Sequence, residues 1–175
     1  MTTTASSPSP LTLITGGSRG LGRNMALAVA RQGHDVLITY RSQQAEAAAV
    51  VAEIEALGQR AAALPLDVGQ SDTFDAFADA VRAQLAVWNR DRFDHLVNNA
   101  GMGVHAAFAE TTRAQFDALV DVHLKGPFFL TQTLLPLIAD GGRIINISSG
   151  LARFALPGYA AYAAMKGAME VLTRY

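Results

Sequence analysis

Short apolar runs alternate with longer stretches of helical spacing along this chain. The runs are rich in Leu, Ile and Val, and most stop at glycine, asparagine, serine or aspartate, as buried strands of a parallel sheet do. They predict strands at residues 11–15, 35–40, 60–66, 93–97 and 143–147. Apolar residues recur at helical spacing between them, which predicts helices at residues 23–31, 44–57, 71–87, 112 to about 138, and 158–175.

A few residues predict where these helices begin, end or change course. Gly33 and Gly58 stand where the first two helices should end, because glycine readily adopts the conformation that closes a helix. Ser71 is placed to cap the N-terminus of the third helix. Gly126 and Pro127 predict an irregularity in the long helix, because proline removes a backbone hydrogen bond.

The alternation of strands and helices with short links predicts an α/β fold. We expect a doubly wound, Rossmann-type parallel sheet between two layers of helices. No linker divides residues 11–175, so we expect a single domain there. Residues 1–10 are rich in Thr, Ser and Pro and lack the features of a signal peptide, and we interpret them as a disordered tail.

Composition excludes several classes of protein. Half of the 175 residues are apolar and the net charge is −1, so neither a basic surface for nucleic acid nor a charge block for a membrane surface is indicated. No run approaches the roughly 18 apolar residues of a membrane span. The absence of cysteine excludes disulfides and thiolate metal sites, and the four histidines have no metal-ligand spacing. We expect a cytoplasmic protein without a metal.

The loop after the first strand is rich in glycine. Gly16, Gly20 and Gly22 would let the backbone turn tightly and approach a pyrophosphate at the start of the next helix, although their spacing differs from the common dinucleotide fingerprint. The alternative is an ordinary tight turn. Its position between the first strand and helix of a βαβ unit favours a dinucleotide site.

The end of the second strand indicates which dinucleotide. NAD sites usually carry a carboxylate there for the ribose hydroxyls, but this chain has Tyr40, Arg41 and Ser42. Arg41, and Arg19 from the glycine loop, could bind the 2′-phosphate of NADP(H). The alternative is two solvated surface arginines.

A tyrosine and a lysine stand one helical turn apart near the C-terminus. Tyr162 and Lys166 share a helix face, and an ammonium beside a phenol favours the phenolate, which makes tyrosine usable as an acid or base. Ser149 precedes Tyr162 by thirteen residues, and Ser148 is its neighbour. The alternatives are a core tyrosine, a surface lysine and an ordinary strand end.

Four motifs together resemble the short-chain dehydrogenase/reductase family. They are Thr15-Gly16-x-x-x-Gly20-x-Gly22, Asn98-Asn99-Ala100-Gly101, Ser149 and Tyr162-x-x-x-Lys166. The resemblance implies that Tyr162 is the catalytic acid or base, that Lys166 lowers its pKa and holds the nicotinamide ribose, and that Ser149 orients the substrate oxygen.

The resemblance also assigns cofactor contacts. The segment 14–22, with Ser18 and Leu21, would wrap the pyrophosphate. Asp67 and Val68 would touch the adenine. Asn98, Ala100 and Gly101 would line the adenosine-ribose side and stiffen the sheet.

His123 departs from the family pattern, which usually has an asparagine at this place. That asparagine bends the long helix, and its carbonyl holds a water that leads from the lysine to solvent. His123 could keep this backbone role, relay protons itself, misplace the water, or pack in the helix with little effect on catalysis.

The C-terminus of the chain also departs from the family pattern. The chain stops at Tyr175, inside the helix that carries Tyr162 and Lys166, whereas family members usually continue with further strands and a substrate-covering helix. We therefore expect a C-terminally incomplete domain whose last strand is partly uncovered.

The resemblance implies an NADP(H)-dependent oxidoreductase that transfers hydride reversibly between the nicotinamide and a carbonyl or secondary alcohol. A 3-oxoacyl thioester or another apolar ketone would suit the apolar loops at 102–108 and 150–157. It also implies a homo-oligomer, a dimer or tetramer. The alternatives are a non-catalytic dinucleotide-binding sensor or scaffold, and a dehydratase or epimerase that retains its cofactor.

Overall fold

The computed structural model describes residues 9–175, so residues 1–8 of the predicted tail lie outside the described part. The strands are β1 (Leu11–Ile14), β2 (Asp35–Tyr40), β3 (Ala61–Pro65), β4 (Phe93–Asn98) and β5 (Ile138–Asn146). The helices are α1 (Gly20–Arg31), α2 (Gln44–Ala56), α3 (Phe74–Val87), α4 (Arg113–Val120), α5 (Gly126–Leu134) and α6 (Ala160–Arg174).

The five strands form one parallel sheet in the order β3-β2-β1-β4-β5. In the centre, Leu13 of β1 pairs with Leu37 of β2 on one side and Leu96 of β4 on the other. The chain runs outward from β1 in one direction to β3 and then returns to continue through β4 and β5. This reversal confirms the predicted doubly wound fold and places a crevice at the carboxyl ends of β1 and β4, where such sheets bind ligands.

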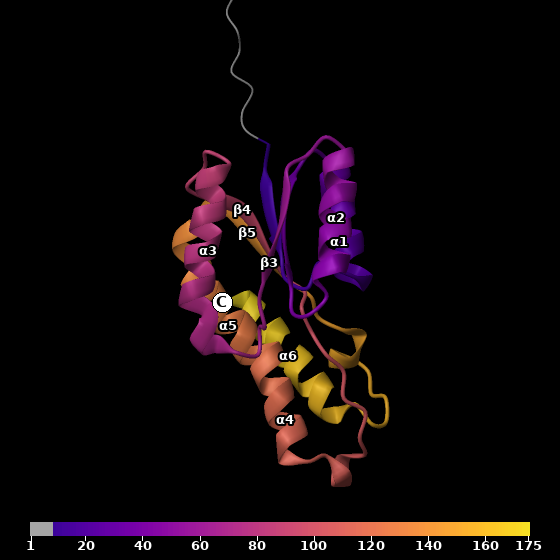
Figure 1. The fold of residues 1–175 in the computed structure, drawn as a ribbon. Coiled ribbons are helices and arrows are strands. Elements are labelled where there is room, and N and C mark those ends of the chain that lie inside the picture. Colours follow the sequence, from indigo (N-terminus) through magenta and orange to yellow (C-terminus); the bar gives the residue numbers. More distant parts are fainter. Residues whose placement is uncertain (1–8) are drawn as a thin grey trace, which may run out of the picture.

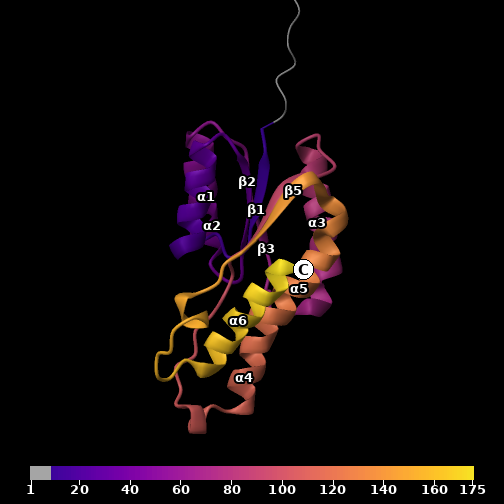
Figure 2. The ribbon, with the colours of Figure 1, turned by 180° about the vertical axis from the view of Figure 1, so that it is seen from behind.

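Helices cover both faces of the sheet (Figures 1 and 2). Leu13 and Leu37 pack with α3 and α5 in one core, whereas Ile14 and Ile38 pack with α1 and α2 in the other. Successive residues of β1 and β2 therefore point to opposite faces, and both faces are buried, as the continuous apolar runs predict. Helices α4 and α6 extend beyond the carboxyl ends of the strands (Figure 1).

The long helix predicted over 112–138 is divided. The predicted irregularity is confirmed: a π-helical turn, Asp121–Lys125, separates α4 from α5. A Cβ at Gly126 would overlap the backbone carbonyl of Val68, so this glycine allows the chain to pass close to the loop after β3. The helix also ends earlier than predicted, because β5 begins at Ile138, opposite Phe93, and then passes through an irregularity in register.

The predicted helix ends are correct in two cases and wrong in one. Gly33 and Gly58 follow α1 and α2 with φ of +90° and +86°, the left-handed conformation that closes a helix. Ser71 does not cap α3, because a short 3-10 turn, Ser71–Thr73, precedes that helix and no side chain caps it.

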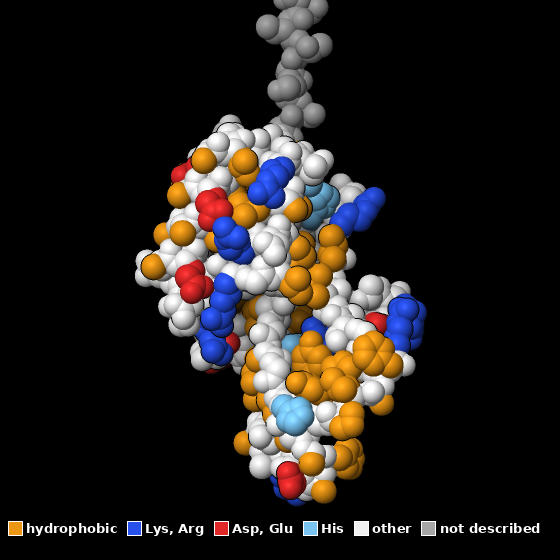
Figure 3. Space-filling view, turned by 90° about the vertical axis from the view of Figure 1, so that its right-hand side faces the viewer, with side chains coloured by type: hydrophobic (Ala, Val, Ile, Leu, Met, Phe, Trp, Pro, Cys, Tyr) orange, Lys and Arg blue, Asp and Glu red, His pale blue; other side chains and the backbone are white. Residues whose placement is uncertain are grey.

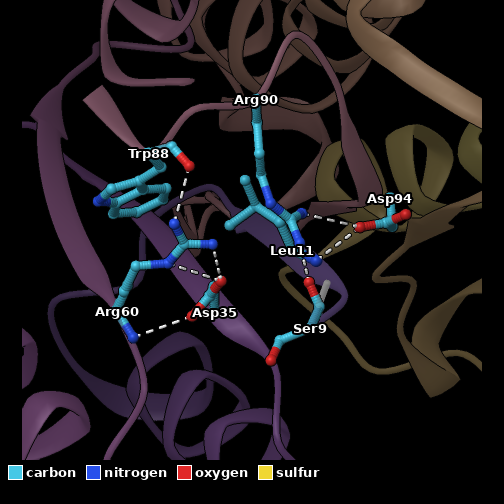
Figure 4. A network of polar contacts seen from close by, with 7 residues as sticks. All are labelled: Ser9, Leu11, Asp35, Arg60, Trp88, Arg90 and Asp94. Carbon is cyan, nitrogen blue, oxygen red and sulfur yellow. Dashed lines mark hydrogen bonds and ion pairs between the residues drawn. The ribbon is translucent and has the colours of Figure 1, made fainter. Parts of the chain in front are cut away.

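A buried carboxylate joins strands β2 and β3 at the amino ends of the strands (Figure 4). Asp35 is 3% exposed and accepts hydrogen bonds from the backbone N of Arg60 at 2.9 Å and from its guanidinium at 3.0 and 2.6 Å. The guanidinium also donates to the carbonyl of Trp88 at 2.9 Å and lies over its ring. This pairing neutralises a charge that would otherwise be costly to bury.

A second carboxylate holds the start of β1 at the same end (Figure 4). Asp94 accepts from the backbone N of Leu11 at 2.7 Å and from Arg90 at 3.3 Å, and Arg90 also donates to the carbonyl of Ser9. These polar contacts occupy the amino ends of the strands, so they leave the opposite edge of the sheet available for a ligand.

Across residues 9–175, no helix has both the length and the apolar character needed to cross a bilayer.

Candidate active site

A cavity of about 760 Å³ lies at the carboxyl ends of the strands. Figure 3 shows a hollow between the upper part of the molecule, which contains the sheet, and the lower part, which contains α4 and α6. Hydrophobic side chains gather on the lower part. Most of the residues predicted for the site line this cavity: Gly16, Ser18, Arg19, Leu21, Gly22, Tyr40, Arg41, Ser42, Val68, Ala100, Gly101, His123, Ser149, Tyr162 and Lys166. Gly20, Asp67 and Asn98 do not line it.

The glycine loop forms one wall and brings the backbone close to the cavity. Gly16 has φ of +67°, and a Cβ there would lie 3.0 Å from the Cα of Ala100. A Cβ at Gly22 would overlap the carbonyl of Gly16. Helix α1 begins at Gly20, and neither a capping side chain from Arg19 nor an acidic residue occupies its first turn. The N–H groups of that turn therefore suit an anion such as a pyrophosphate.

Thr15 and Asn99 fix this loop to the end of β4. The Thr15 hydroxyl accepts from the backbone N of Asn99 and of Ala100, both at 3.0 Å, and donates to the carbonyl of Val97 at 3.3 Å. The Asn99 side chain donates to the carbonyls of Thr15 and Gly16 at 2.9 and 3.2 Å. Asn99 was missed as a site residue, although its place directly after a strand was a signal.

Two predicted cofactor contacts, Asn98 and Asp67, are not among the residues that line the cavity. The Asn98 amide donates to Thr131 at 3.1 Å and to Asn146 at 2.8 Å, so it joins β4 to α5 and β5. The Asp67 carboxylate accepts from the backbone N of Gly69 at 3.0 Å and shapes the turn after β3. In this geometry both residues support the walls of the cavity.

The outer end of the cavity carries positive charge. Tyr40 is the last residue of β2, Arg41 and Ser42 follow it, and Arg19 approaches from the glycine loop. No Asp or Glu is among the described residues that line the cavity. A 2′-phosphate fits such a wall better than a ribose hydroxyl that needs a carboxylate partner.

Tyr162 and Lys166 meet at the inner end. Lys166 is 5% exposed, its Nζ donates to the carbonyl of Ile147 at 2.7 Å, and it lies 5.7 Å from the centre of the Tyr162 ring. Burial lowers the pKa of Lys166. Ser149 follows β5 and accepts from the backbone N of Leu151 at 3.2 Å. Serine, tyrosine and lysine side chains thus line one cavity with the glycine loop.

His123 packs behind Tyr162. The imidazole is 2% exposed, and its ring meets the Tyr162 ring edge to face with the centroids 5.2 Å apart. Nε2 lies 2.6 Å from the carbonyl O and 3.2 Å from the N of Met102, so either tautomer binds the same residue. Burial lowers the pKa of His123; the Met102 carbonyl opposes this, and Lys166 lowers the pKa further.

The comparisons with known proteins decide the family. A family model described as short chain dehydrogenase matches residues 10–175. This chain belongs to the short-chain dehydrogenase/reductase family.

Relatives of this dehydrogenase/reductase cover most of the chain. It is 39% identical over 162 residues to the short-chain dehydrogenase/reductase FrzI of Cladobotryum sp, and 35% identical over 164 residues to the 3-oxoacyl-[acyl-carrier-protein] reductase FabG of Staphylococcus aureus (strain N315). Each alignment covers 93% of this chain but only 61% and 65% of the relative. The chain therefore spans less than two thirds of the length of either relative.

Solved structures of family members show the same fold with NADP. The angucycline C-6 ketoreductase LanV with bound NADP has a TM-score of 0.89 at 37% identity, covering 93% of this chain and 64% of LanV. A short chain dehydrogenase from Burkholderia cenocepacia J2315 in complex with NADP has a TM-score of 0.86 at 36% identity, covering 94% and 66%. The predicted family and fold are confirmed.

A second cavity of about 620 Å³ adjoins the first in this family member. Leu151 and Tyr159 line both cavities, and Phe108, Phe154 and Leu156 make the wall of the second one apolar. Most of its lining residues belong to the segment 151–160, which follows Ser149 in the chain. Among residues 9–175, no group of three or more His, Cys, Asp or Glu side chains could hold a metal ion.

Proposed function

We propose that this chain carries the catalytic machinery of an NADP(H)-dependent oxidoreductase that interconverts a carbonyl compound and a secondary alcohol. The observation that carries the proposal is the convergence of Ser149, Tyr162 and Lys166 on a cavity whose other wall is an anion-binding glycine loop. Bound NADP(H) would supply or accept the hydride.

The chain's own residues supply the proton and hold the substrate oxygen. In the reductive direction, the Ser149 hydroxyl donates a hydrogen bond to the carbonyl oxygen, and the Tyr162 hydroxyl gives it a proton as the alcohol forms. The ammonium of Lys166, held by the Ile147 carbonyl, stabilises the phenolate that remains. The oxidation runs through the same contacts in reverse.

Arg41 and Arg19 support NADP(H) as the preferred dinucleotide. Both line the outer end of the cavity, and residues 9–175 contribute no Asp or Glu to its lining. Guanidinium groups bind phosphate through several donors at once. The family members LanV and the Burkholderia dehydrogenase are described with NADP bound, which agrees with this preference.

The second cavity supports an apolar substrate. Its wall of Phe108, Leu151, Phe154 and Leu156 suits an acyl chain or a ring system attached to the carbonyl. A 3-oxoacyl thioester or another apolar ketone would fit. A cytoplasmic location and assembly into dimers or tetramers remain predictions of the sequence.

His123 favours one alternative, a dinucleotide-binding module without catalysis. A bulky ring held by the Met102 backbone fills the space behind Tyr162. If that ring blocks the return of protons to Lys166 and Tyr162, the chain would bind the nucleotide and turn over slowly or not at all.

NADPH consumption separates the two functions. The chain would be offered a panel of 3-oxoacyl thioesters and aliphatic and aromatic ketones, with NADPH binding measured on the same preparation by fluorescence. We expect binding together with oxidation of NADPH by at least one apolar ketone. Binding without oxidation across the panel would favour the module, and the absence of binding would contradict both functions.

A further inference from the structure

Glu170 stands on the same face of α6 as the proposed catalytic pair. Tyr162, Lys166 and Glu170 follow one another at intervals of four, so they lie on one face of the helix. Lys166 and Glu170 both contact the segment at the end of β5. The Glu170 side chain is 32% exposed, and its Oε1 accepts a hydrogen bond from the Ser148 hydroxyl at 3.1 Å. None of the motifs in the sequence includes this residue.

Helix α6 holds the end of β5 through three side chains. Lys166 Nζ donates to the carbonyl of Ile147 at 2.7 Å, Glu170 accepts from Ser148, and Thr173 accepts from the Asn146 side chain at 3.0 Å. Three successive residues of the strand end are thus fixed to one helix. Ser149 is the next residue, so its position beside the cavity depends on these three hydrogen bonds.

The hydroxyl groups of the two neighbouring serines, Ser148 and Ser149, differ in their hydrogen bonds. Ser148 has one hydroxyl hydrogen, and it points to the Glu170 carboxylate at 3.1 Å or to the Lys166 carbonyl at 3.3 Å. The carboxylate is the stronger acceptor. Ser149 accepts from Leu151 and has no acceptor for its own hydrogen among the described residues. Its hydroxyl therefore keeps a hydrogen to donate to a substrate oxygen.

The same carboxylate oxygen reaches the loop over the second cavity. Arg153 Nε lies 3.7 Å from Glu170 Oε1, and the Arg153 side chain is 80% exposed, so this ion pair contributes little. Arg153 follows the 3-10 turn Gly150–Ala152, and its loop supplies Leu151, Phe154 and Leu156 to the apolar wall. Glu170 thus lies beside both the serine segment and the substrate loop.

We propose that Glu170 is a positioning residue that acts through Ser148. By accepting the hydrogen bond of the Ser148 hydroxyl, it sets the place of the next residue, Ser149. The inference rests on the proposed oxidoreductase function and names a residue that this function does not itself require.

Two substitutions test the contact to Ser148. Glu170→Ala removes it, and we expect kcat to fall about tenfold, because a slightly misplaced group loses much of its effect on the transition state. Glu170→Gln keeps an oxygen for the Ser148 hydroxyl, and we expect it to restore kcat to within about twofold. The loss of the charge beside the exposed Arg153 should change KM little.

A readout without catalysis keeps the test independent of the proposed function. The amides of Ala152, Arg153 and Phe154 donate to the carbonyls of Ser149 and Gly150. Their hydrogen exchange should quicken about tenfold in Glu170→Ala and remain unchanged in Glu55→Ala, an exposed glutamate of α2.

A failure of the proposed function and a failure of the proposed role of Glu170 would give different results. A wild-type chain that oxidises no NADPH would refute the proposed function, and the exchange rates would still decide the role of Glu170. Unchanged exchange at residues 152–154 in Glu170→Ala, or wild-type kcat and KM in that variant, would overturn the inference. We expect Glu170→Ala to bind NADPH as tightly as the wild type does.

Discussion

At the scale of single residues, Arg41 tests the choice of dinucleotide. Replacing it by alanine removes a guanidinium from the outer end of the cavity, where the lining residues that the structure describes include no Asp or Glu. We expect Arg41→Ala to weaken NADPH binding about 10- to 100-fold, the loss of a charge-assisted contact, and to change NADH binding little. Arg31→Ala, at the exposed end of α1, is the control. Equal losses for both nucleotides would contradict the assignment.

His123 should make the stability of the fold depend on pH. Its pKa is lowered in the folded chain, mainly by burial, so on acidification the unfolded chain takes up the proton first. The free energy of unfolding should therefore fall as the pH drops through the window just below the ordinary histidine pKa of about 6.5.

Urea unfolding of the wild type and of His123→Asn at pH 7.5 and at pH 5 checks this prediction. We expect a smaller loss of stability on acidification in the variant. His34 adds a separate dependence of the same sign, because burial and His95 lower its pKa, and this part remains in both proteins. An equal loss in the two proteins would show that His123 is not buried in its neutral form.

The side chains proposed to be catalytic could be predicted from the sequence, but the contacts that hold them could not. Tyr162 and Lys166 were visible because their spacing on a helix is fixed by helix geometry. The contacts of Asn99, Met102 and Ser148 were not predicted, because their partners lie far away in the sequence. His123 was noticed as a departure, yet its contacts with Met102 and Tyr162 depend on the π-helical turn.

At the scale of elements, the π-helical turn and its neighbour Gly126 position His123. A Cβ at Gly126 would overlap the Val68 carbonyl and lie 3.0 Å from that of Asp121. We expect Gly126→Ala to lower the free energy of unfolding by about 1–3 kcal/mol, because backbone atoms must move to make room.

Gly167 in α6 offers a matched control for that substitution. Nothing lies within 4 Å of a Cβ built there, so alanine should fit in the helix. We expect Gly167→Ala to raise the free energy of unfolding by up to about 1 kcal/mol. Chemical denaturation measures both variants, and a Gly126→Ala chain as stable as the wild type would contradict the packing described for α5.

Elements with a strong periodic pattern were predicted well, and those set by tertiary contacts were not. The runs that became β1 and β2 are apolar throughout, so their burial on both faces followed directly. The division of the 112–138 helix was only partly foreseen, because a π-helical turn has no signature in hydrophobic spacing. The early start of β5 depends on pairing with Phe93, which local residues do not reveal.

At the scale of the whole molecule, stability and ligand binding are assigned to opposite ends of the sheet. The Asp35–Arg60 pair lies at the amino ends of the strands and the cavity at their carboxyl ends. Arg60→Ala leaves a buried carboxylate without its partner, so we expect a loss of about 3 kcal/mol in the free energy of unfolding. The affinity for NADPH should stay unchanged.

The control for this loss is an exposed ion pair. Arg92 and Asp140 lie 3.3 Å apart with side chains 46% and 104% exposed, and such pairs contribute little. Arg92→Ala should change the free energy of unfolding by less than about 1 kcal/mol. A small effect of Arg60→Ala, similar to that of Arg92→Ala, would show that the network does not hold the amino end of the sheet together.

The most direct test of the whole account is NADPH oxidation by Tyr162→Phe. The variant keeps the ring against His123 and Lys166 but has no hydroxyl to give a proton to the substrate. We predict a loss of turnover of about 100-fold or more with NADPH binding retained, whereas Tyr175→Phe, at a fully exposed position, keeps wild-type turnover. Wild-type turnover by Tyr162→Phe would contradict the proposed catalytic role of this tyrosine.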